Sequence, residues 1–246
     1  MAIGWEMVSL PLLLVLWQVL AMIFAHRLFP TPIAVAEQIW LLASEGRLLI
    51  DLGKTLWRAM TAFVIAMVMG GALGIFLGRQ DWADRLFSGW LIVGLNLPAI
   101  VVAIVLYIWL GLTETALIAA VVINKAPLVI VTIREGVRSF GADYEELAGA
   151  LRLSFGRRLR LIYWPQLLPF ILAAARTGLS LIWKIVLVFE VLGSDGGVGY
   201  RVSVMFQFFD VTGILAYTAS FILVVLGFEY GVLRPLERRA LAWRRA

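Results

Sequence analysis

Cysteine is absent from the 246-residue chain, and histidine occurs once, as His26. Disulfide bonds, thiolate chemistry, iron–sulfur clusters and His-rich zinc sites are therefore excluded. Charged residues are also scarce, at 15% compared with about 25% in an ordinary soluble domain. The chain is instead 62% apolar, with 10 Trp and 14 Phe. This composition excludes a disordered chain and indicates a protein of the lipid bilayer.

Six apolar segments are long enough to cross a bilayer as helices, which takes about 20 residues for roughly 30 Å of hydrocarbon. They lie at about residues 7–26, 57–78, 88–110, 114–134, 167–192 and 212–233. Continuously apolar runs favour helices over barrel strands, in which apolar and polar residues alternate. The first segment lacks a preceding basic flank and a following cleavage site, so we expect it to be retained. The sequence predicts one all-α membrane domain over residues 1–246, with six transmembrane helices.

The distribution of Lys and Arg predicts the orientation of the chain. With both termini in the cytoplasm, thirteen of these residues fall in cytoplasmic connections and five in external ones. Cytoplasmic connections of membrane proteins are enriched in Lys and Arg. We therefore expect a multi-pass protein with both termini in the cytoplasm.

The second apolar segment carries a stripe of glycines, Gly70, Gly74 and Gly78, spaced by four residues. This spacing places them on one face of a helix. Small residues at such positions let a second helix backbone approach closely. We expect this face to pack tightly against another helix.

Motifs for catalysis or nucleotide binding are missing. The stretch Gly53-Lys54-Thr55 has the end of a phosphate-binding loop, but Leu48 stands where the motif requires its first glycine. No G-x-S-x-G turn accompanies the single histidine, and no aspartate lies in the interior of a predicted span. We expect no catalytic residue, metal site or cofactor on this chain, and no nucleic-acid partner.

The connection between the fourth and fifth spans, at about residues 139–165, is long and amphipathic. Acidic residues begin it, apolar residues recur through it, and arginines end it, an order that suits the dipole of a helix. Two interpretations remain open: the segment docks into the groove of a partner protein, or it packs as a surface helix on its own bundle.

Several stretches resemble the permease subunits of ATP-binding-cassette importers, most closely the nitrate, sulfonate and taurine branch. The cytoplasmic signature of these permeases is matched in part by Glu146, Leu147 and Ala148 and by Trp164-Pro165, whereas Arg152 stands in place of a glycine. Further matches are Leu28 to Pro32, Trp109, Leu110, Gly111, Glu114, Arg176, Gly178, Trp183, Glu190, Leu192, Gly193, Gly197, Gly199 and Tyr200. The resemblance covers nearly the whole chain. A glycine at position 152 would support a turn between two short helices, and arginine departs from that pattern.

The resemblance implies a bundle of five core helices and one peripheral helix in a bacterial inner membrane. It also implies a homodimer around a central path, with an ATPase docked beneath each subunit and an external solute-binding protein that delivers the substrate. The residues it assigns to ATPase coupling are Tyr144, Glu145, Glu146, Leu147, Ala148, Arg152, Leu153, Ser154 and Phe155.

Four charged residues lie in or near the spans, where a charge is costly unless it is paired or hydrated: Lys125, Arg176, Lys184 and Glu190. Arg176, Trp183 and Glu190 recur at intervals of seven and share one helix face. Arg176 and Glu190 are about 21 Å apart along that helix, so each needs a partner elsewhere. They are fold-supporting pairs or part of a path. The excess of positive charge favours an anionic solute such as a sulfonate, nitrate or carboxylate.

Two asparagines next to prolines interrupt the third and fourth spans, where freed carbonyl groups can face a water-lined path or simply accompany a kink. The predicted path candidates are Asn96, Asn124, Lys125, Arg176, Trp183, Lys184 and Glu190. Polar residues in kinked helices also suit a stand-alone secondary transporter or channel, which is the main alternative function. An intramembrane enzyme is a second alternative.

Overall fold

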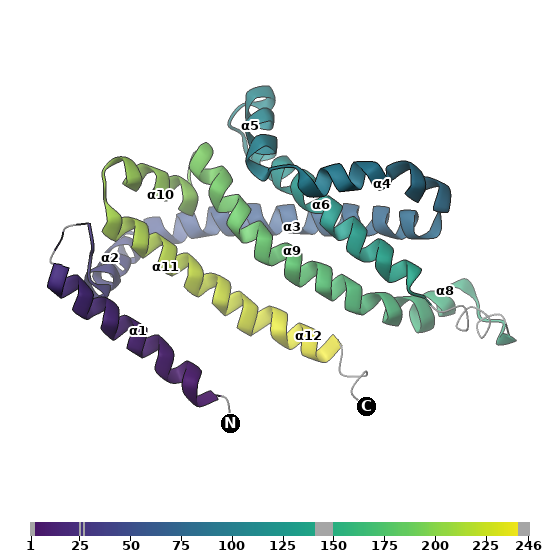
Figure 1. Ribbon diagram of the computed structural model, residues 1–246, viewed down its shortest axis with the longest axis horizontal. Coiled ribbons are helices and arrows are strands. Elements are labelled where there is room, and N and C mark those ends of the chain that lie inside the picture. Colours follow the sequence, from purple (N-terminus) through teal and green to yellow (C-terminus); the bar gives the residue numbers. More distant parts are fainter. Residues whose placement is uncertain (1–2, 25, 27, 141–149, 241–246) are drawn as a thin grey trace. The chain divides into compact units, whose positions relative to one another are not determined.

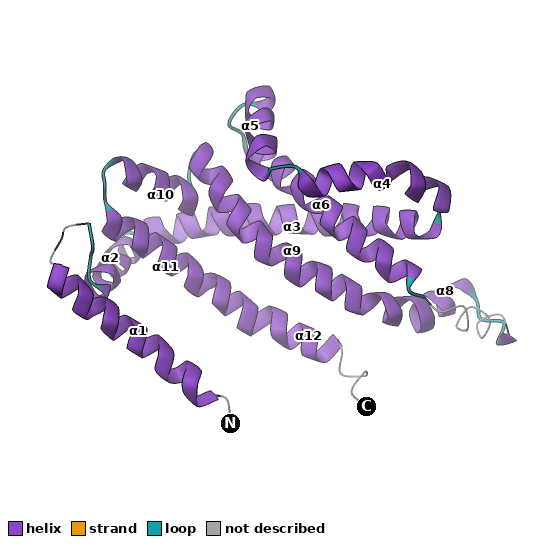
Figure 2. Ribbon diagram, in the orientation of Figure 1, coloured by secondary structure: helices purple, strands orange, loops and turns teal. Residues whose placement is uncertain are grey.

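The computed structural model describes residues 3–24, 26, 28–140 and 150–240, and these residues form helices joined by short turns (Figure 2). No strand occurs among the described residues. The all-α class that the apolar runs predict is confirmed.

The elements follow one another in the order shown in Figure 1. They are α1 (Ile3–Phe24), α2 (Pro32–Ser44), α3 (Arg47–Arg79), α4 (Asp81–Asn96), α5 (Ala99–Leu110), α6 (Glu114–Arg138), α8 (Phe155–Arg158), the π-helical turn η1 (Leu159–Tyr163), α9 (Trp164–Leu192), α10 (Val198–Gln207), α11 (Val211–Phe228), the π-helical turn η2 (Glu229–Leu233) and α12 (Arg234–Ala240). Threonine hydroxyls cap two of the helix starts: Thr31 accepts from the N–H of Ala34 in α2, and Thr113 accepts from that of Ala116 in α6.

Four stretches are long and apolar enough to cross a membrane: α3, α6, residues 156–192 and residues 211–240. A fifth crossing forms only if α4 and α5 are counted together, and their axes bend by 94° at the break that contains Leu97 and Pro98. The described residues therefore contain four candidate spans, or five if α4 and α5 form one, and the predicted count of six is not exactly confirmed.

The chain divides into two compact units. Unit 1 comprises Met1–Leu56 and Glu190–Leu226, and unit 2 comprises Trp57–Phe189 and Gly227–Ala246. The boundaries fall inside α3, α9 and α11 rather than in linkers. A single membrane domain over the whole chain stays a prediction, and the two units are described separately below.

The core of unit 2 forms where α3 packs on α6. A Cβ atom at Gly70 would lie 2.7 Å from the Cβ of Val129, and one at Gly78 would lie 2.7 Å from the Cβ of Val137. At Gly74 the added atom would lie 2.8 Å from the backbone oxygen of Ile130. The predicted tight packing of the glycine face is confirmed, and α6 is the helix that it meets.

Candidate functional site

The segment predicted to dock a partner lies between α6 and α9 in unit 2. Five of its predicted coupling residues, Tyr144, Glu145, Glu146, Leu147 and Ala148, lie outside the described residues. The described part begins again at Ala150, and Arg152, Leu153 and Ser154 lead into α8, which begins at Phe155. The chain turns at Arg152 with a φ of +47°. A non-glycine residue seldom adopts this left-handed conformation, so the turn that a glycine would support is present although the glycine is not.

The two ends of this segment are held together by aromatic contacts. The ring of Phe140, which follows α6, stacks on the ring of Tyr163, in η1, with 5.7 Å between centroids. The guanidinium of Arg79, at the end of α3, lies 5.1 Å from the centre of the same tyrosine ring. An apolar cavity of about 290 Å³ lies beside these contacts, lined in part by Val137 and Trp164. We call this arrangement the docking stem.

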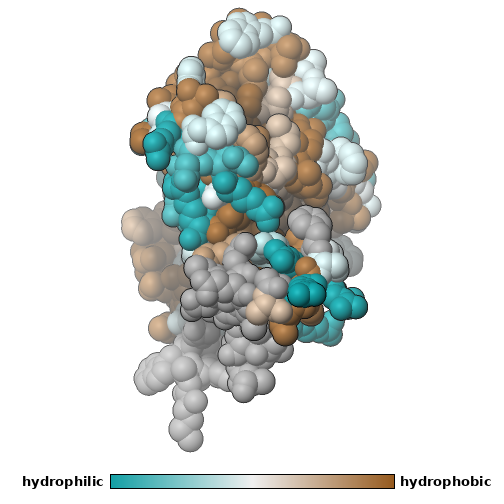
Figure 3. All heavy atoms as spheres, turned by 90° about the vertical axis from the view of Figure 1, so that its right-hand side faces the viewer, coloured by the Kyte–Doolittle hydropathy of each residue, from teal (hydrophilic) through white to brown (hydrophobic). Residues whose placement is uncertain are grey.

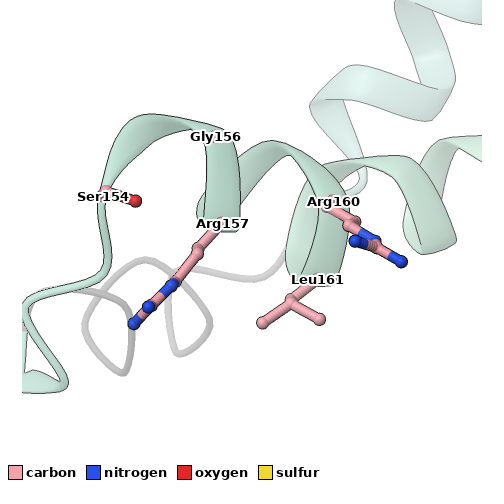
Figure 4. Close-up of a pocket in the computed structure, with 5 residues that line it drawn as sticks. All are labelled: Ser154, Gly156, Arg157, Arg160 and Leu161. Carbon is pink, nitrogen blue, oxygen red and sulfur yellow. The ribbon is translucent and has the colours of Figure 1, made fainter.

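A shallow groove of about 560 Å³ lies along α8 and η1. Ser154, Gly156, Arg157, Arg160 and Leu161 line it, and Figure 4 shows the two arginine side chains extending in different directions from the helix. Both arginines are exposed. The groove therefore presents positive charge at the end of the predicted docking segment.

A cluster of ion pairs, hereafter the ion cluster, joins the start of α4 to the end of α6. Asp84 accepts a hydrogen bond from Arg134 and pairs with Arg138, each at 2.8 Å. Arg134 also pairs with Glu135 at 2.8 Å. Figure 3 looks from the right-hand side of Figure 1, where α8 lies, and shows hydrophilic residues gathered beside hydrophobic ones on that face. Asp84 was not a predicted site residue, because its burial depends on α6.

Two predicted path candidates, Asn96 and Asn124, lie near the break between α4 and α5: Asn96 ends α4, and Asn124 belongs to α6. The side-chain amide of Asn124 donates to the backbone oxygen of Leu97, in the break, at 3.3 Å. The side-chain amide of Asn96 donates to the backbone oxygen of Ile92, one turn earlier in α4, and Asn96 is exposed. Lys125 follows Asn124 and is buried at 7% exposure. The structure thus places Asn124 beside the break between α4 and α5.

The charged residues of α9 do not act together. Arg176 pairs with Glu229 at 3.6 Å and with Glu237 at 3.4 Å, so its charge is balanced by acids near the C-terminus. Trp183 is buried and contacts the ring of Phe228, whereas Lys184 is exposed. The predicted excess of positive charge omitted Glu229, and Arg176 does not contribute to it.

Glu190 belongs to a buried polar cluster in unit 1. Its carboxylate accepts the hydroxyl of Thr55 at 2.9 Å and the backbone N–H of Gly199 at 2.8 Å. The hydroxyl of Thr55 in turn accepts the N–H of Val198 at 2.8 Å. A Cβ atom at Gly197, where φ is +101°, would collide with the Glu190 carboxylate. Glycine at this position therefore allows the loop to close over the acid.

Asp51 completes this cluster one turn before Thr55 on α3. Its carboxylate accepts the N–H of Gly197 at 3.1 Å, the Nε of Arg201 at 2.8 Å and the hydroxyl of Tyr217 at 3.0 Å. The hydrogen bond to Asp51 raises the pKa of Arg201 above its ordinary value, although burial opposes this change. Asp51, Thr55, Glu190, Arg201 and Tyr217 are hereafter the loop cluster. It supports the fold-supporting interpretation of Glu190.

Arg58, which the charge distribution assigns to an external connection, has a buried side chain that is 1% exposed. It donates through Nε to both carboxylate oxygens of Glu114, at 3.0 and 2.8 Å, and it also donates through Nη2. Glu114 begins α6, so the pair ties α3 to the start of that helix. In the sequence, the signal for this ion pair was a base and an acid at the edges of two predicted spans.

Within the described part of the chain, no group of three His, Cys, Asp or Glu side chains is placed to hold a metal ion. The absence of a cofactor stays a prediction.

The fold and these sites define a multi-pass helical membrane protein with a structured stem at one long connection. Residues 70–233 match the family described as binding-protein-dependent transport system inner membrane component. The match covers more than half of the chain, which therefore belongs to this family. The protein is the permease subunit of an ATP-binding-cassette importer, a non-catalytic inner-membrane component that works with a separate ATPase and a solute-binding protein.

Known proteins similar to this chain agree with this assignment. The taurine transport system permease protein TauC of Escherichia coli is 26% identical over 94% of this chain and 86% of its own length. The riboflavin transport system permease protein RibX of Chloroflexus aurantiacus is 29% identical over 96% and 88%. A solved chain of the inward-facing MetNI methionine ABC transporter shares the fold, with a TM-score of 0.67, 16% identity, and coverage of 78% of this chain and 96% of that chain.

Proposed function

We propose that this permease works as a homodimer that moves a small anionic solute, such as a sulfonate, nitrate or carboxylate, into the cytoplasm. The observation that carries the proposal is the family match, which spans every predicted path candidate and the whole segment 139–165. Both termini and this segment face the cytoplasm in the proposal, as the distribution of Lys and Arg favours.

Each subunit docks one ATPase in this proposal, and the docking residues are those that the resemblance assigns. They are Tyr144, Glu145, Glu146, Leu147, Ala148, Arg152, Leu153, Ser154 and Phe155. The docking stem supports this role, because Phe140 and Tyr163 bring the two ends of the segment together. A segment whose ends are held presents a defined surface to a partner at a lower entropic cost.

An anionic solute is supported by the surroundings of Lys125. It is buried, and no acidic side chain pairs with it in the described part of the chain. A buried ammonium group in a membrane span is costly unless an anion or water accompanies it. The name of TauC supports a sulfonate, whereas that of RibX does not, so similarity of sequence does not identify the solute.

Purification of the tagged permease from bacterial membranes tests the assembly. We expect an ATPase to copurify and Glu146→Lys to release it, because the substitution reverses a charge in the docking segment. Glu37→Lys is the matched control, since Glu37 is an exposed acid of α2 and lies outside segment 139–165. Solute uptake by the isolated permease along an ion gradient would contradict the proposal and favour a stand-alone transporter.

The same complex in proteoliposomes tests the solute class. Lys125→Met is expected to lower the ATP-driven uptake of the transported anion by roughly tenfold or more, the effect of losing one charge-assisted contact. Arg47→Met is the control, because the side chain of Arg47 is 67% exposed and the residue is not a path candidate. Equal uptake by the two variants would remove the support for an anionic solute.

A further inference from the structure

The ion cluster holds one buried carboxylate by both of its oxygens. Oδ1 of Asp84 lies 2.8 Å from Nη1 of Arg134, and Oδ2 lies 2.8 Å from Nη2 of Arg138. The side chain of Asp84 is 11% exposed. Two charge-assisted contacts on a mostly buried acid restrict its geometry more than an exposed surface pair does.

The two arginines lie one turn apart at the end of α6. Arg138 is the last residue of that helix, and the predicted docking segment begins at residue 139. Asp84 lies in the first turn of α4. The ion cluster therefore joins the start of α4 to the point from which the docking segment leaves the bundle.

Contacts farther along the two helices continue this connection. Leu91 of α4 packs with Ile130 of α6 in a buried apolar cluster. A Cβ atom at Gly94 would lie 2.8 Å from the ring of Pro127, so the helices approach closely there. Beyond this contact the chain bends by 94° between α4 and α5. When α6 moves and α4 moves with it, the displacement therefore reaches this bend.

We infer that Asp84 is a positioning residue that transmits the movement of the docked ATPase from the end of α6 to α4 and to the bend before α5. The inference rests on the proposed docking of an ATPase at residues 139–165. With the ion cluster intact, the ends of α4 and α6 move together. Without it, the end of α6 moves with the ATPase while α4 stays in place, and ATP is hydrolysed without transport.

Parallel measurements of ATP hydrolysis and solute uptake test this role, with the complete complex in proteoliposomes. Asp84→Asn is expected to raise the number of ATP molecules hydrolysed per solute about fivefold or more, the size of a typical coupling between sites. The rate of hydrolysis is expected to remain within about twofold of that of the unmodified complex. An unchanged ratio in Asp84→Asn overturns the inference.

Two further variants separate positioning from simple charge balance. Asp81→Asn is the matched control: this acid is on the same turn, but its side chain is 83% exposed and lies 3.7 Å from Arg138, so the ratio should stay unchanged. The triple variant Asp84→Asn, Arg134→Gln, Arg138→Gln removes the three charges that form the two contacts and leaves no buried charge, since Glu135 and Asp81, which lose their arginine partners, have side chains 56% and 83% exposed. We expect it to remain uncoupled. Recovery of normal coupling in the triple variant would show that the cluster only balances charge.

The outcomes also distinguish this inference from the proposed function. If the unmodified complex shows no ATP-driven uptake, the proposed function fails. If it transports normally and Asp84→Asn does too, only the role of Asp84 fails. Should Asp84→Asn not assemble, Arg138→Gln replaces it, because Arg138 is partly exposed and its loss leaves one contact to Asp84. An unchanged ratio in that variant contradicts the inference.

Discussion

Two buried carboxylates of this permease are satisfied in different ways. In unit 1, Glu190 accepts a backbone N–H from Gly199 and the hydroxyl of Thr55. In unit 2, Asp84 is held by the guanidinium groups of Arg134 and Arg138. Backbone donors fix a loop directly to the acid, whereas the two arginine side chains link the ends of two helices through their charges. The first arrangement suits a fixed part of a transporter and the second suits a part that transmits movement.

The largest expected effect is at the fixed loop. Glu190→Ala leaves the N–H of Gly199 buried without its acceptor, and the hydroxyl of Thr55 keeps only the backbone oxygen of Asp51, at 3.2 Å. We expect the free energy of unfolding to fall by about 3 kcal/mol, the cost of the unsatisfied buried donor together with the hydrogen bonds that Thr55 loses. Thermal unfolding of the purified protein in detergent measures this change.

An exposed acid near the same loop supplies the control for Glu190. Asp195 pairs with Lys54 at 3.7 Å, and its side chain is 73% exposed. Asp195→Asn should change the stability by less than about 0.5 kcal/mol, because exposed ion pairs contribute little. Equal effects of the two substitutions would contradict the role of the loop cluster.

An intermediate effect on the free energy of unfolding is expected where α3 packs on α6. It sharpens the comparison of the two carboxylates, because it shows how unit 2 is stabilised by packing without charges. Gly74→Ala places a methyl group 2.8 Å from the backbone oxygen of Ile130. The helices must separate, which costs about 1–3 kcal/mol. Gly71→Ala is the matched control, because no atom lies within 4 Å of the added group, and it should stabilise the helix by about 0.5–1 kcal/mol. Unfolding measurements should give opposite signs for the two neighbours, and destabilisation by both would contradict this account of the packing.

The smallest effect is expected in the docking segment. Arg152→Gly removes a side chain from a residue with a φ of +47°, a conformation that costs a non-glycine residue about 1 kcal/mol. Unfolding of the purified protein should show an increase in stability of up to about 1 kcal/mol. A loss of stability would mean that the arginine side chain stabilises the turn by a contact of its own.

The sequence predicted best those features that depend on local pattern. The membrane helices follow from apolar length, the glycine face follows from its spacing of four residues, and the break before α5 follows from Pro98. The partners of the buried charges could not be predicted. Asp51 and Glu190 are 139 positions apart, and nothing in a single sequence indicates that one loop closes over both acids.

The apolar length of its segments, a property of the chain alone, determined that this is a helical membrane protein, and its sequence motifs carried the resemblance to importer permeases. The tertiary structure alone decided which charges are balanced. Arg176 pairs with Glu229, and Arg58 is buried against Glu114, whereas Lys125 is buried without an acidic partner among the described residues. The physical reason is that the cost of a charge in a membrane depends on its neighbours in space, and helix packing chooses those neighbours.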